Sequence, residues 1–144
     1  MTIAAILKHK GHDVTAVRPT DTVAEVSAVL AQRGIGAVLV RDAAATVLGI
    51  VSERDIVRAL ARHGARTLEM TAAQLMVIEL RTAKPETTEA EAMTMMTEGR
   101  FRHLPVVKNG QLVGLISIGD VVKARLMQQE QEVDSLRAYV AGAA

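Results

Sequence analysis

The chain has 144 residues, of which 49% are hydrophobic, enough for one compact domain or two very small ones. Seventeen basic and sixteen acidic residues leave a net charge of +1, and Phe101 and Tyr139 are the only aromatic residues, so composition argues against a nucleic-acid-binding protein. The absence of cysteine excludes disulfides and thiolate chemistry, and no apolar run is long enough to span a membrane, so we expect a soluble, cytoplasmic protein.

The first half of the chain predicts a short N-terminal helix followed by a β-α-β-β-α unit. Gly11 ends the N-terminal helix, Thr22–Glu25 has the pattern of a capping box, and Gly34 ends the helix that follows. Apolar runs and helical periodicity then place the elements in order. We expect helices at 3–10, 22–32 and 52–62, and strands at 14–17, 36–40 and 47–51.

The second half repeats the first at an interval of about 66 residues. Pro85 corresponds to Pro19, Thr88–Glu91 corresponds to the capping box, and an apolar strand at 104–107 follows. We therefore predict an α/β (α+β) fold of tandem β-α-β-β-α repeats related by a pseudo-two-fold axis. The predicted boundaries are a first repeat with the N-terminal helix at 1–65, a linker at 66–77, a second repeat at 78–126 and a helical tail at 127–144.

The most informative repeated stretch is Gly49–Asp55, which returns as Gly114–Asp120. Each copy reads glycine, two aliphatic residues, serine, two variable residues and aspartate, and lies where a strand passes into a helix. Such a junction presents free backbone N–H groups and the positive end of a helix dipole, so it can bind an anion. Serine followed three residues later by an acid is also a helix N-cap signature. The repetition alone does not separate these two interpretations, because caps recur with folds.

The tail carries a heptad pattern of apolar residues with one polar interruption. Its members are Val122, Leu126, Gln129, Val133, Leu136 and Val140. This helix could fold back on its own domain or pack against another subunit, and its extension beyond the second repeat favours the second arrangement. We therefore expect a homodimer. His9 and His12 are separated by Gly11 and lack supporting acids, which argues against a metal site.

These motifs resemble the cystathionine-β-synthase (CBS) domain family, in the form of the tandem pair called a Bateman module. The resemblance lies in residues 49–58, 100–107 and 114–120 and extends from about residue 12 to 126, leaving no separate catalytic domain. It implies a regulatory module, not an enzyme, that binds AMP, ADP, ATP, NAD(H) or S-adenosylmethionine between the repeats. It also implies dimerisation of two pairs into a four-repeat disc, and an unknown regulated partner.

The resemblance also implies roles for individual residues. Asp55 and Asp120 would bind the ribose hydroxyls, and Ser52 and Ser117 would lie near ribose or phosphate. The candidate phosphate-binding cations are Arg54, Arg102, His103 and Lys10; we prefer Arg102 to Arg100 because it adjoins His103. The base pocket would be formed by Thr15, Gly36, Ala37, Val38, Arg81, Leu104 and Pro105. Because Gly119 stands where the first repeat has Arg54, we expect two unequal sites.

Two other functional hypotheses remain open from the sequence. The chain could be an interaction or dimerisation module with vestigial nucleotide pockets. It could also be a hydrolase with Glu53 as its best acid, although it has no phosphate-binding loop of the P-loop type and no spaced metal cluster. Glu53 is explained equally well as an acid in the first turn of a helix. We therefore predict a sensor of adenine nucleotides that reports energy or redox state and modulates a partner.

Overall fold

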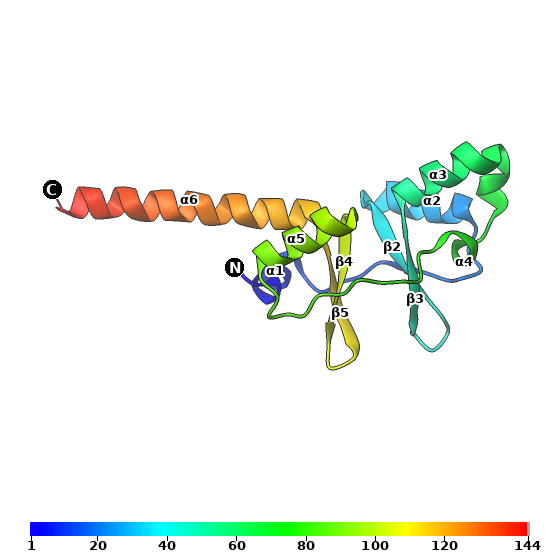
Figure 1. Cartoon of the computed structure of the whole chain (residues 1–144), viewed down its shortest axis with the longest axis horizontal. Coiled ribbons are helices and arrows are strands. Elements are labelled where there is room, and N and C mark those ends of the chain that lie inside the picture. The colour runs from blue at the N-terminus through cyan, green and yellow to red at the C-terminus, as the bar shows by residue number, and fades with distance from the viewer. Residues whose placement is uncertain (144) are drawn as a thin grey trace. The chain divides into compact units, whose positions relative to one another are not determined.

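The computed structural model describes residues 1–143, so Ala144, the last residue of the predicted tail, lies outside the described residues. The predicted mixed α/β architecture is confirmed (Figure 1). The chain divides into two compact units. The first-repeat unit comprises residues 14–80, and the second-repeat unit comprises residues 1–13 together with the chain from residue 81 onward.

The first-repeat unit is a three-stranded sheet with its helices. Strands β1 (Ala16–Val17), β2 (Ala37–Arg41) and β3 (Val47–Ser52) are hydrogen-bonded in that order, β1 parallel and β3 antiparallel to β2. Helices α2 (Val23–Arg33) and α3 (Glu53–His63) follow β1 and β3, and a 3-10 turn η1 (Gly64–Glu69) and α4 (Ala72–Leu75) complete the unit. The core contains Val26, Val38, Val51, Ile56 and Ala72.

The second-repeat unit has the same plan around a two-stranded sheet. Strands β4 (His103–Lys108) and β5 (Gln111–Ser117) pair antiparallel, and the first strand is reduced to one bridge between Ala83 and Val106. Helix α1 (Ile3–Lys10), α5 (Glu89–Gly99) and α6 (Ile118–Ala143) pack with the sheet. The core contains Ile3, Leu7, Ala92, Leu104, Ile116 and Val121.

Helix α2 and helix α5 start as the capping pattern predicts. The Thr22 hydroxyl accepts a hydrogen bond from the Glu25 backbone N–H at 3.2 Å, and Thr88 does the same for Glu91 at 3.1 Å. Gly34 ends α2 in the left-handed conformation that glycine adopts without steric cost. Both repeats thus use the same local signals to turn a loop into a helix.

The placement of the N-terminal helix in the first repeat is wrong. Ile3, Ile6 and Leu7 are buried in the core of the second-repeat unit, and the Ile3 N–H donates to the Thr87 carbonyl at 2.8 Å. The helix packs on β5 because burying these apolar side chains there stabilises the fold. Being close in sequence to the first repeat does not by itself place the helix on that repeat.

The segment predicted as a linker at 66–77 belongs to the first-repeat unit. Thr67 is fully buried and its hydroxyl donates to the Ala59 carbonyl at 2.9 Å, while Ala72 lies in the core. Helix α4 therefore occupies in the first repeat the place that α1 occupies in the second. The chain crosses between the units at residues 13–14 and 80–81 instead.

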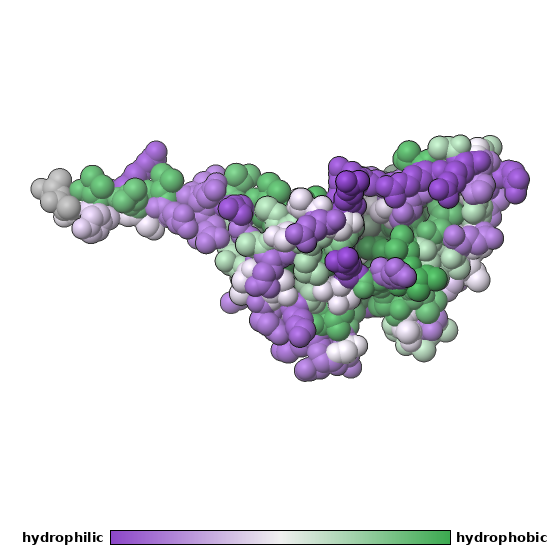
Figure 2. All heavy atoms as spheres, viewed as in Figure 1, coloured by the Kyte–Doolittle hydropathy of each residue, from purple (hydrophilic) through white to green (hydrophobic). Residues whose placement is uncertain are grey.

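The predicted helical tail is continuous with the helix that follows β5. Helix α6 runs from Ile118 to Ala143 and extends beyond the other elements of its unit (Figure 1). Apolar and polar residues both lie along its exposed outer part (Figure 2). In the part of the chain that the structure describes, no helix is long and apolar enough to cross a membrane.

Candidate functional site

The first junction joins β3 to α3 through a reciprocal set of hydrogen bonds. The Ser52 hydroxyl accepts from the Asp55 backbone N–H at 3.3 Å, and the Asp55 Oδ2 accepts from the Ser52 backbone N–H at 2.8 Å and from its hydroxyl at 2.9 Å. The capping interpretation of this motif is therefore correct. It uses one carboxylate oxygen, since no hydrogen bond from a described residue reaches Asp55 Oδ1.

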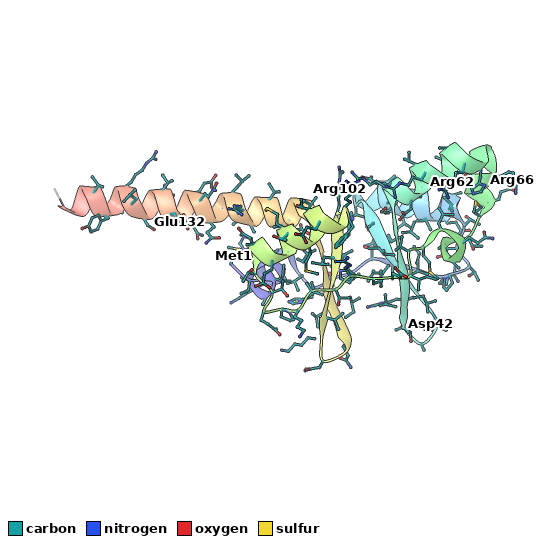
Figure 3. The ribbon with its side chains drawn as sticks, viewed as in Figure 1. Met1, Asp42, Arg62, Arg66, Arg102 and Glu132 are labelled. Carbon is teal, nitrogen blue, oxygen red and sulfur yellow. The ribbon has the colours of Figure 1, made fainter. Side chains whose placement is uncertain are left out.

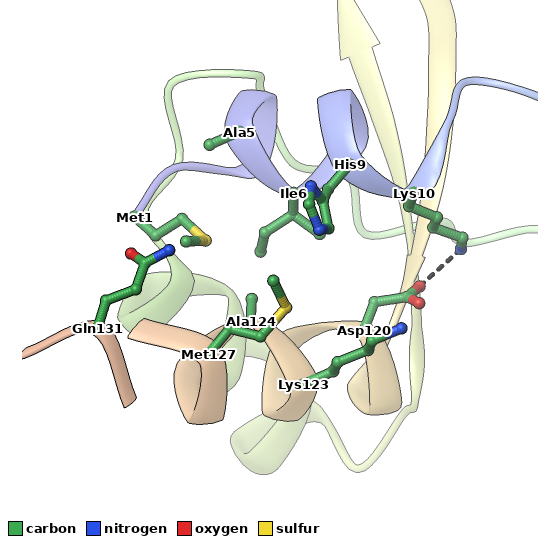
Figure 4. A pocket seen from close by; sticks show the side chains of 10 residues that line it. All are labelled: Met1, Ala5, Ile6, His9, Lys10, Asp120, Lys123, Ala124, Met127 and Gln131. Atoms are coloured by element: carbon green, nitrogen blue, oxygen red, sulfur yellow. Dashed lines mark hydrogen bonds and ion pairs between the residues drawn. The ribbon is translucent and has the colours of Figure 1, made fainter. Parts of the chain in front are cut away.

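The second junction, between β5 and α6, has the same cap with an added cation. The Asp120 Oδ2 accepts from the Ser117 backbone N–H at 2.8 Å, and the Ser117 hydroxyl accepts from the Asp120 backbone N–H at 3.1 Å. Lys10 donates to Asp120 Oδ2 at 2.6 Å (Figure 4). It also donates to the Leu115 carbonyl at 2.6 Å. Here too, the hydrogen bonds from the serine N–H and from Lys10 both go to Oδ2.

The ion pair changes the acidity of Asp120. Burial alone would raise the pKa of this carboxyl. The hydrogen bond from Lys10, the Ser117 backbone N–H, the charge of Lys10 and the Ser117 hydroxyl outweigh burial, so that the pKa lies below its ordinary value. The ionised carboxylate is therefore the form that the folded chain stabilises.

The pKa shift predicts a pH-dependent contribution of Lys10 to stability. A pKa lowered on folding stabilises the folded chain above the unfolded pKa, and the contribution is lost as pH falls through the folded pKa. We expect Lys10→Met to lower the free energy of unfolding by about 1 kcal/mol near neutral pH, because the pair is only partly buried. Urea unfolding from neutral pH downward should show this difference disappearing on acidification.

Lys8→Met is the matched control for that measurement. Lys8 lies on the same helix and forms no ion pair with any of residues 1–143, so its substitution should have little effect at any pH. A Lys10→Met effect that stayed constant down to the acid limit of folding would contradict the coupling to Asp120.

The strand pairing places the two junctions at equivalent positions. Ala37 pairs with Ser52 as His103 pairs with Ser117, and in both sheets the register shifts directly after the residue that pairs with the motif glycine, Val40 or Val106. In each repeat the residue after the serine donates its N–H to the carbonyl that precedes the strand. The distances are 2.9 Å from Glu53 to Gly36 and 2.8 Å from Ile118 to Arg102.

Each junction has one arginine at an equivalent level, but the two arginines come from different parts of the repeat. The first repeat has Arg54 on the helix start and Gly36 before the strand, whereas the second has Gly119 on the helix start and Arg102 before the strand. Both arginines are exposed (Arg102 is labelled in Figure 3). Arg100 instead caps the end of α5 in a left-handed conformation, whereas the Arg102 carbonyl takes part in the backbone bond at the junction.

The residues predicted for the base pocket fall into two groups. The side chains of Val38 and Leu104 are fully buried in the cores of their units, which excludes them as side-chain contacts of a ligand. Side chains alternate along a strand, so Ala37, His103 and Pro105 lie on the opposite sheet face, where Ala37 and Pro105 are also buried and His103 is partly exposed. Thr15 and Arg81 hold equivalent positions in the two repeats. Thr15 lies two residues before Val17, which pairs with Val40 of β2, and Arg81 lies two residues before Ala83, which pairs with Val106 of β4.

The sequence prediction missed a close contact at each motif glycine, made by α1 in one repeat and by the segment after α4 in the other. A Cβ at Gly114 would lie 2.6 Å from a Leu7 methyl group of α1, and a Cβ at Gly49 would lie 2.8 Å from the Val77 carbonyl that follows α4. The motif glycines are therefore required for close packing. The signal for these helices was present, because Met1–Thr2–Ile3–Ala4 returns as Met70–Thr71–Ala72–Ala73.

Backbone contacts of the two segments confirm this correspondence. The Ile3 N–H donates to Thr87 and the Ala72 N–H to Asp21, both at 2.8 Å. The residue packed on the motif glycine lies within α1 in one case, Leu7, and two residues after the end of α4 in the other, Val77. Within the described residues, no group of three histidine, aspartate or glutamate side chains could hold a metal ion.

Comparisons with known proteins agree on one family. The model of the CBS domain family matches residues 7–62 and 72–127. The mitochondrial CBS domain-containing protein CBSX3 of Arabidopsis thaliana is 44% identical over 64 residues, which are 44% of this chain and 31% of that protein. CBSCBSPB1 of Arabidopsis thaliana is 28% identical over 87% of this chain and 23% of its own length, so the chain spans under a third of either relative.

Solved structures share the fold over most of the chain. The CBS-domain containing protein ATU1752 of Agrobacterium tumefaciens is 44% identical, with a TM-score of 0.85 over 86% of this chain and 92% of that one. The CBS domain protein PAE2072 of Pyrobaculum aerophilum, solved as a complex with AMP, is 28% identical, with a TM-score of 0.72 over 83% of this chain and 89% of that one.

Proposed function

We propose that this chain, which belongs to the CBS domain family, is a regulatory module that binds an adenine nucleotide and thereby modulates a partner protein. Tandem CBS domains fill most of its length, and a structural relative of 28% identity was solved with AMP. The ligand class that we propose comprises AMP, ADP, ATP and NAD(H). Binding would report the energy or redox state of the cell, which we take to be the cytoplasm.

The observation that carries this proposal is that the cap of each helix uses one carboxylate oxygen of the motif aspartate. The hydrogen bonds that hold the start of each helix use Oδ2 of Asp55 and Asp120 and not Oδ1. A carboxylate oxygen has two lone pairs and can accept from two neighbouring hydroxyl groups. The cap thus fixes the carboxylate in place and leaves Oδ1 for the two hydroxyls of a ribose.

The phosphate of the nucleotide would lie against the helix start and its arginine. A helix N-terminus favours an anion through its backbone N–H groups and dipole, and arginine pairs with phosphate through two parallel hydrogen bonds. Arg54 supplies this cation at the first junction, and Arg102 supplies it at the second. His103 adjoins Ser117 from the paired strand and is half-buried, so it would approach the sugar or base, whereas Ala37 beside Ser52 is buried.

The two sites would differ in affinity because Lys10 is bonded to only one aspartate. Its ammonium group lies 2.6 Å from Asp120 Oδ2, on the oxygen that also caps the helix. Ribose binding at Asp120 therefore has to share a carboxylate whose charge is already partly neutralised. We expect Asp55 to provide the stronger ribose site.

The ribose assignment predicts selectivity for ribonucleotides. AMP should bind more tightly than 2′-deoxy-AMP by about 1–3 kcal/mol, on the order of 5- to 150-fold, because the deoxy ligand leaves an aspartate acceptor without its donor. Isothermal titration calorimetry measures both affinities directly. Asp55→Asn should reduce the discrimination, since an amide offers one acceptor oxygen. Equal affinities of the unmodified protein would remove the ribose role from both aspartates.

A protein that bound none of these ligands would support a different function, an interaction module with vestigial pockets. Mass spectrometry of the purified protein for a co-purifying nucleotide is the first measurement to make. We assign no enzymatic activity. Glu53, the best candidate acid, lies in the first turn of α3, where a carboxylate stabilises the helix dipole.

A further inference from the structure

The outer half of α6 has apolar side chains without contacts in its own unit. Every described side chain from residue 129 to 142 is exposed, and Leu136 and Tyr139 are 63% and 74% exposed. A lone helix of this length, about four turns, is marginal in water, because its stability depends on packing one apolar face. The segment is therefore expected to be covered by a partner.

Helix α6 uses different faces for its own unit and for this apolar surface. Val121 and Ala124 are buried in the core, and Met127 lines the groove of about 380 Å³ between α1 and α6 (Figure 4). The apolar seam lies on another face of the helix. We define the seam as Val122, Leu126, Gln129, Val133, Leu136 and Val140, whose apolar members are 44–63% exposed.

We propose that the seams of two copies of this chain pair as a parallel, in-register coiled coil. In the heptad notation, Leu126, Val133 and Val140 occupy position a, and Val122, Gln129 and Leu136 occupy position d. A β-branched residue at a with leucine at d is the combination that favours two strands. This combination occurs in the outer part of the helix, where the exposure is greatest.

The charges beside the seam select the parallel orientation. In a parallel pair, a g residue faces the e residue five positions later on the other helix. Glu132 at g then meets Arg137 of the partner subunit, and Arg125 meets Glu130 of the partner subunit. Antiparallel helices pair g with g and e with e, so Glu132 at g and Arg137 at e would not face each other in that orientation.

Two further observations refine this arrangement. Arg125 lies 3.6 Å from Glu89 in its own unit, whereas Glu132 and Arg137 have no ion pair with a described residue, so the outer pair is free for a second helix (Glu132 is labelled in Figure 3). Gln129 at d faces its own copy only in the parallel in-register pair, where each amide can donate and accept across the seam. A buried polar residue of this kind fixes the register of a coiled coil.

Cysteine cross-linking in the full chain tests the register. Because the natural chain has no cysteine, a single introduced thiol can form a disulfide only between copies. We expect Gln129→Cys to give a covalent dimer on a non-reducing gel after mild oxidation, since facing d positions lie within disulfide range. Ala138→Cys, at position f on the opposite face, is the matched control and should stay uncross-linked. Absence of the Gln129→Cys dimer, or equal yields from both variants, would overturn the proposal.

Charge reversal in the Gln129→Cys background tests the orientation. Glu132→Lys and Arg137→Glu should each slow cross-linking about tenfold, because each creates two like-charge contacts per dimer. The double variant should recover the original rate, and a mixture of the two single variants should cross-link mainly as a heterodimer. Single variants that cross-linked at the original rate would exclude the parallel g–e pairing. The readout uses no nucleotide, so its outcome is independent of the proposed function.

Discussion

Saturating AMP is expected to raise the melting temperature of this protein by about 5–10 °C. A ligand that binds only the folded state stabilises it by about 2.7 kcal/mol at a hundredfold excess over its dissociation constant. For a chain of this size, each kcal/mol shifts the melting temperature by roughly 2–4 °C. Guanine and pyrimidine nucleotides should give much smaller shifts. Differential scanning fluorimetry or calorimetry measures the shift.

Aspartate variants assign the shift to one junction or the other. Asp55→Ala and Asp120→Ala each remove a ribose acceptor and also a helix cap, so each variant must be compared with its own ligand-free melting temperature. Asp55→Ala should lose more of the ligand-induced shift, because Asp120 is already paired with Lys10. Thr22→Ala is the control, since it removes a cap of the same kind away from the junctions.

Two results would contradict this prediction in different ways. If both aspartate variants melted at lower temperature but kept the full shift with ligand, the aspartates would be caps alone. If the unmodified protein ignored every adenine ligand, the interaction module would become the better hypothesis, and the coiled-coil proposal would still stand.

The sequence predicts the repeats well because their signals are local. Thr22 and Thr88 cap helices, and the motif serines sit at strand-to-helix junctions, because hydroxyl and carboxylate groups satisfy backbone N–H groups within three residues. The equivalence of the repeats follows from the same signals. The sequence narrows the phosphate-binding arginine of the second repeat to Arg100 or Arg102, and the choice of Arg102 stays a prediction, although its backbone carbonyl accepts from the Ile118 N–H at the junction.

The features that the sequence prediction missed depend on contacts between distant segments. The pairing of Lys10 with Asp120 joins residues 110 positions apart, and no local pattern predicts it. The base pocket was predicted from runs of neighbouring residues, but within these runs Ala37, Val38, Leu104 and Pro105 are all buried. Which face of a strand is buried depends on the layer that covers it, so a continuous apolar run does not reveal it.

Helix α1 packs in the second-repeat unit and α4 in the first-repeat unit, and the sequence contains a signal for the equivalence of these two helices. Met1–Thr2–Ile3–Ala4 and Met70–Thr71–Ala72–Ala73 are visible as a repeat, but the interval is 69 rather than 66 residues. This pattern identifies the two segments as equivalent, but it does not predict on which repeat's core each segment packs. Helix α1 covers the later repeat because its three buried apolar residues fit the core around Leu104 and Ile116.

Leu7→Ala should therefore destabilise the second-repeat unit, although Leu7 lies before the first-repeat unit in the chain. Leu7 is 1% exposed, and truncating a buried leucine to alanine costs about 2–5 kcal/mol. We expect a lower midpoint of urea unfolding, and faster amide hydrogen exchange in β4 and β5 than in β2 and β3. Leu60→Ala is the control, because Leu60 is 40% exposed on α3 and its truncation should cost far less.

A second substitution, Gly114→Ala, tests whether Leu7 packs directly on Gly114 of β5. A methyl group at Gly114 would lie 2.6 Å from a Leu7 methyl, so Gly114→Ala alone should cost about 1–3 kcal/mol through overpacking. In the Leu7→Ala background the same methyl enters space that the leucine has vacated. The double variant should thus be more stable than the sum of the two single effects predicts, by about 1 kcal/mol or more. Additive effects would mean that α1 does not pack on the Gly114 face of β5 in solution.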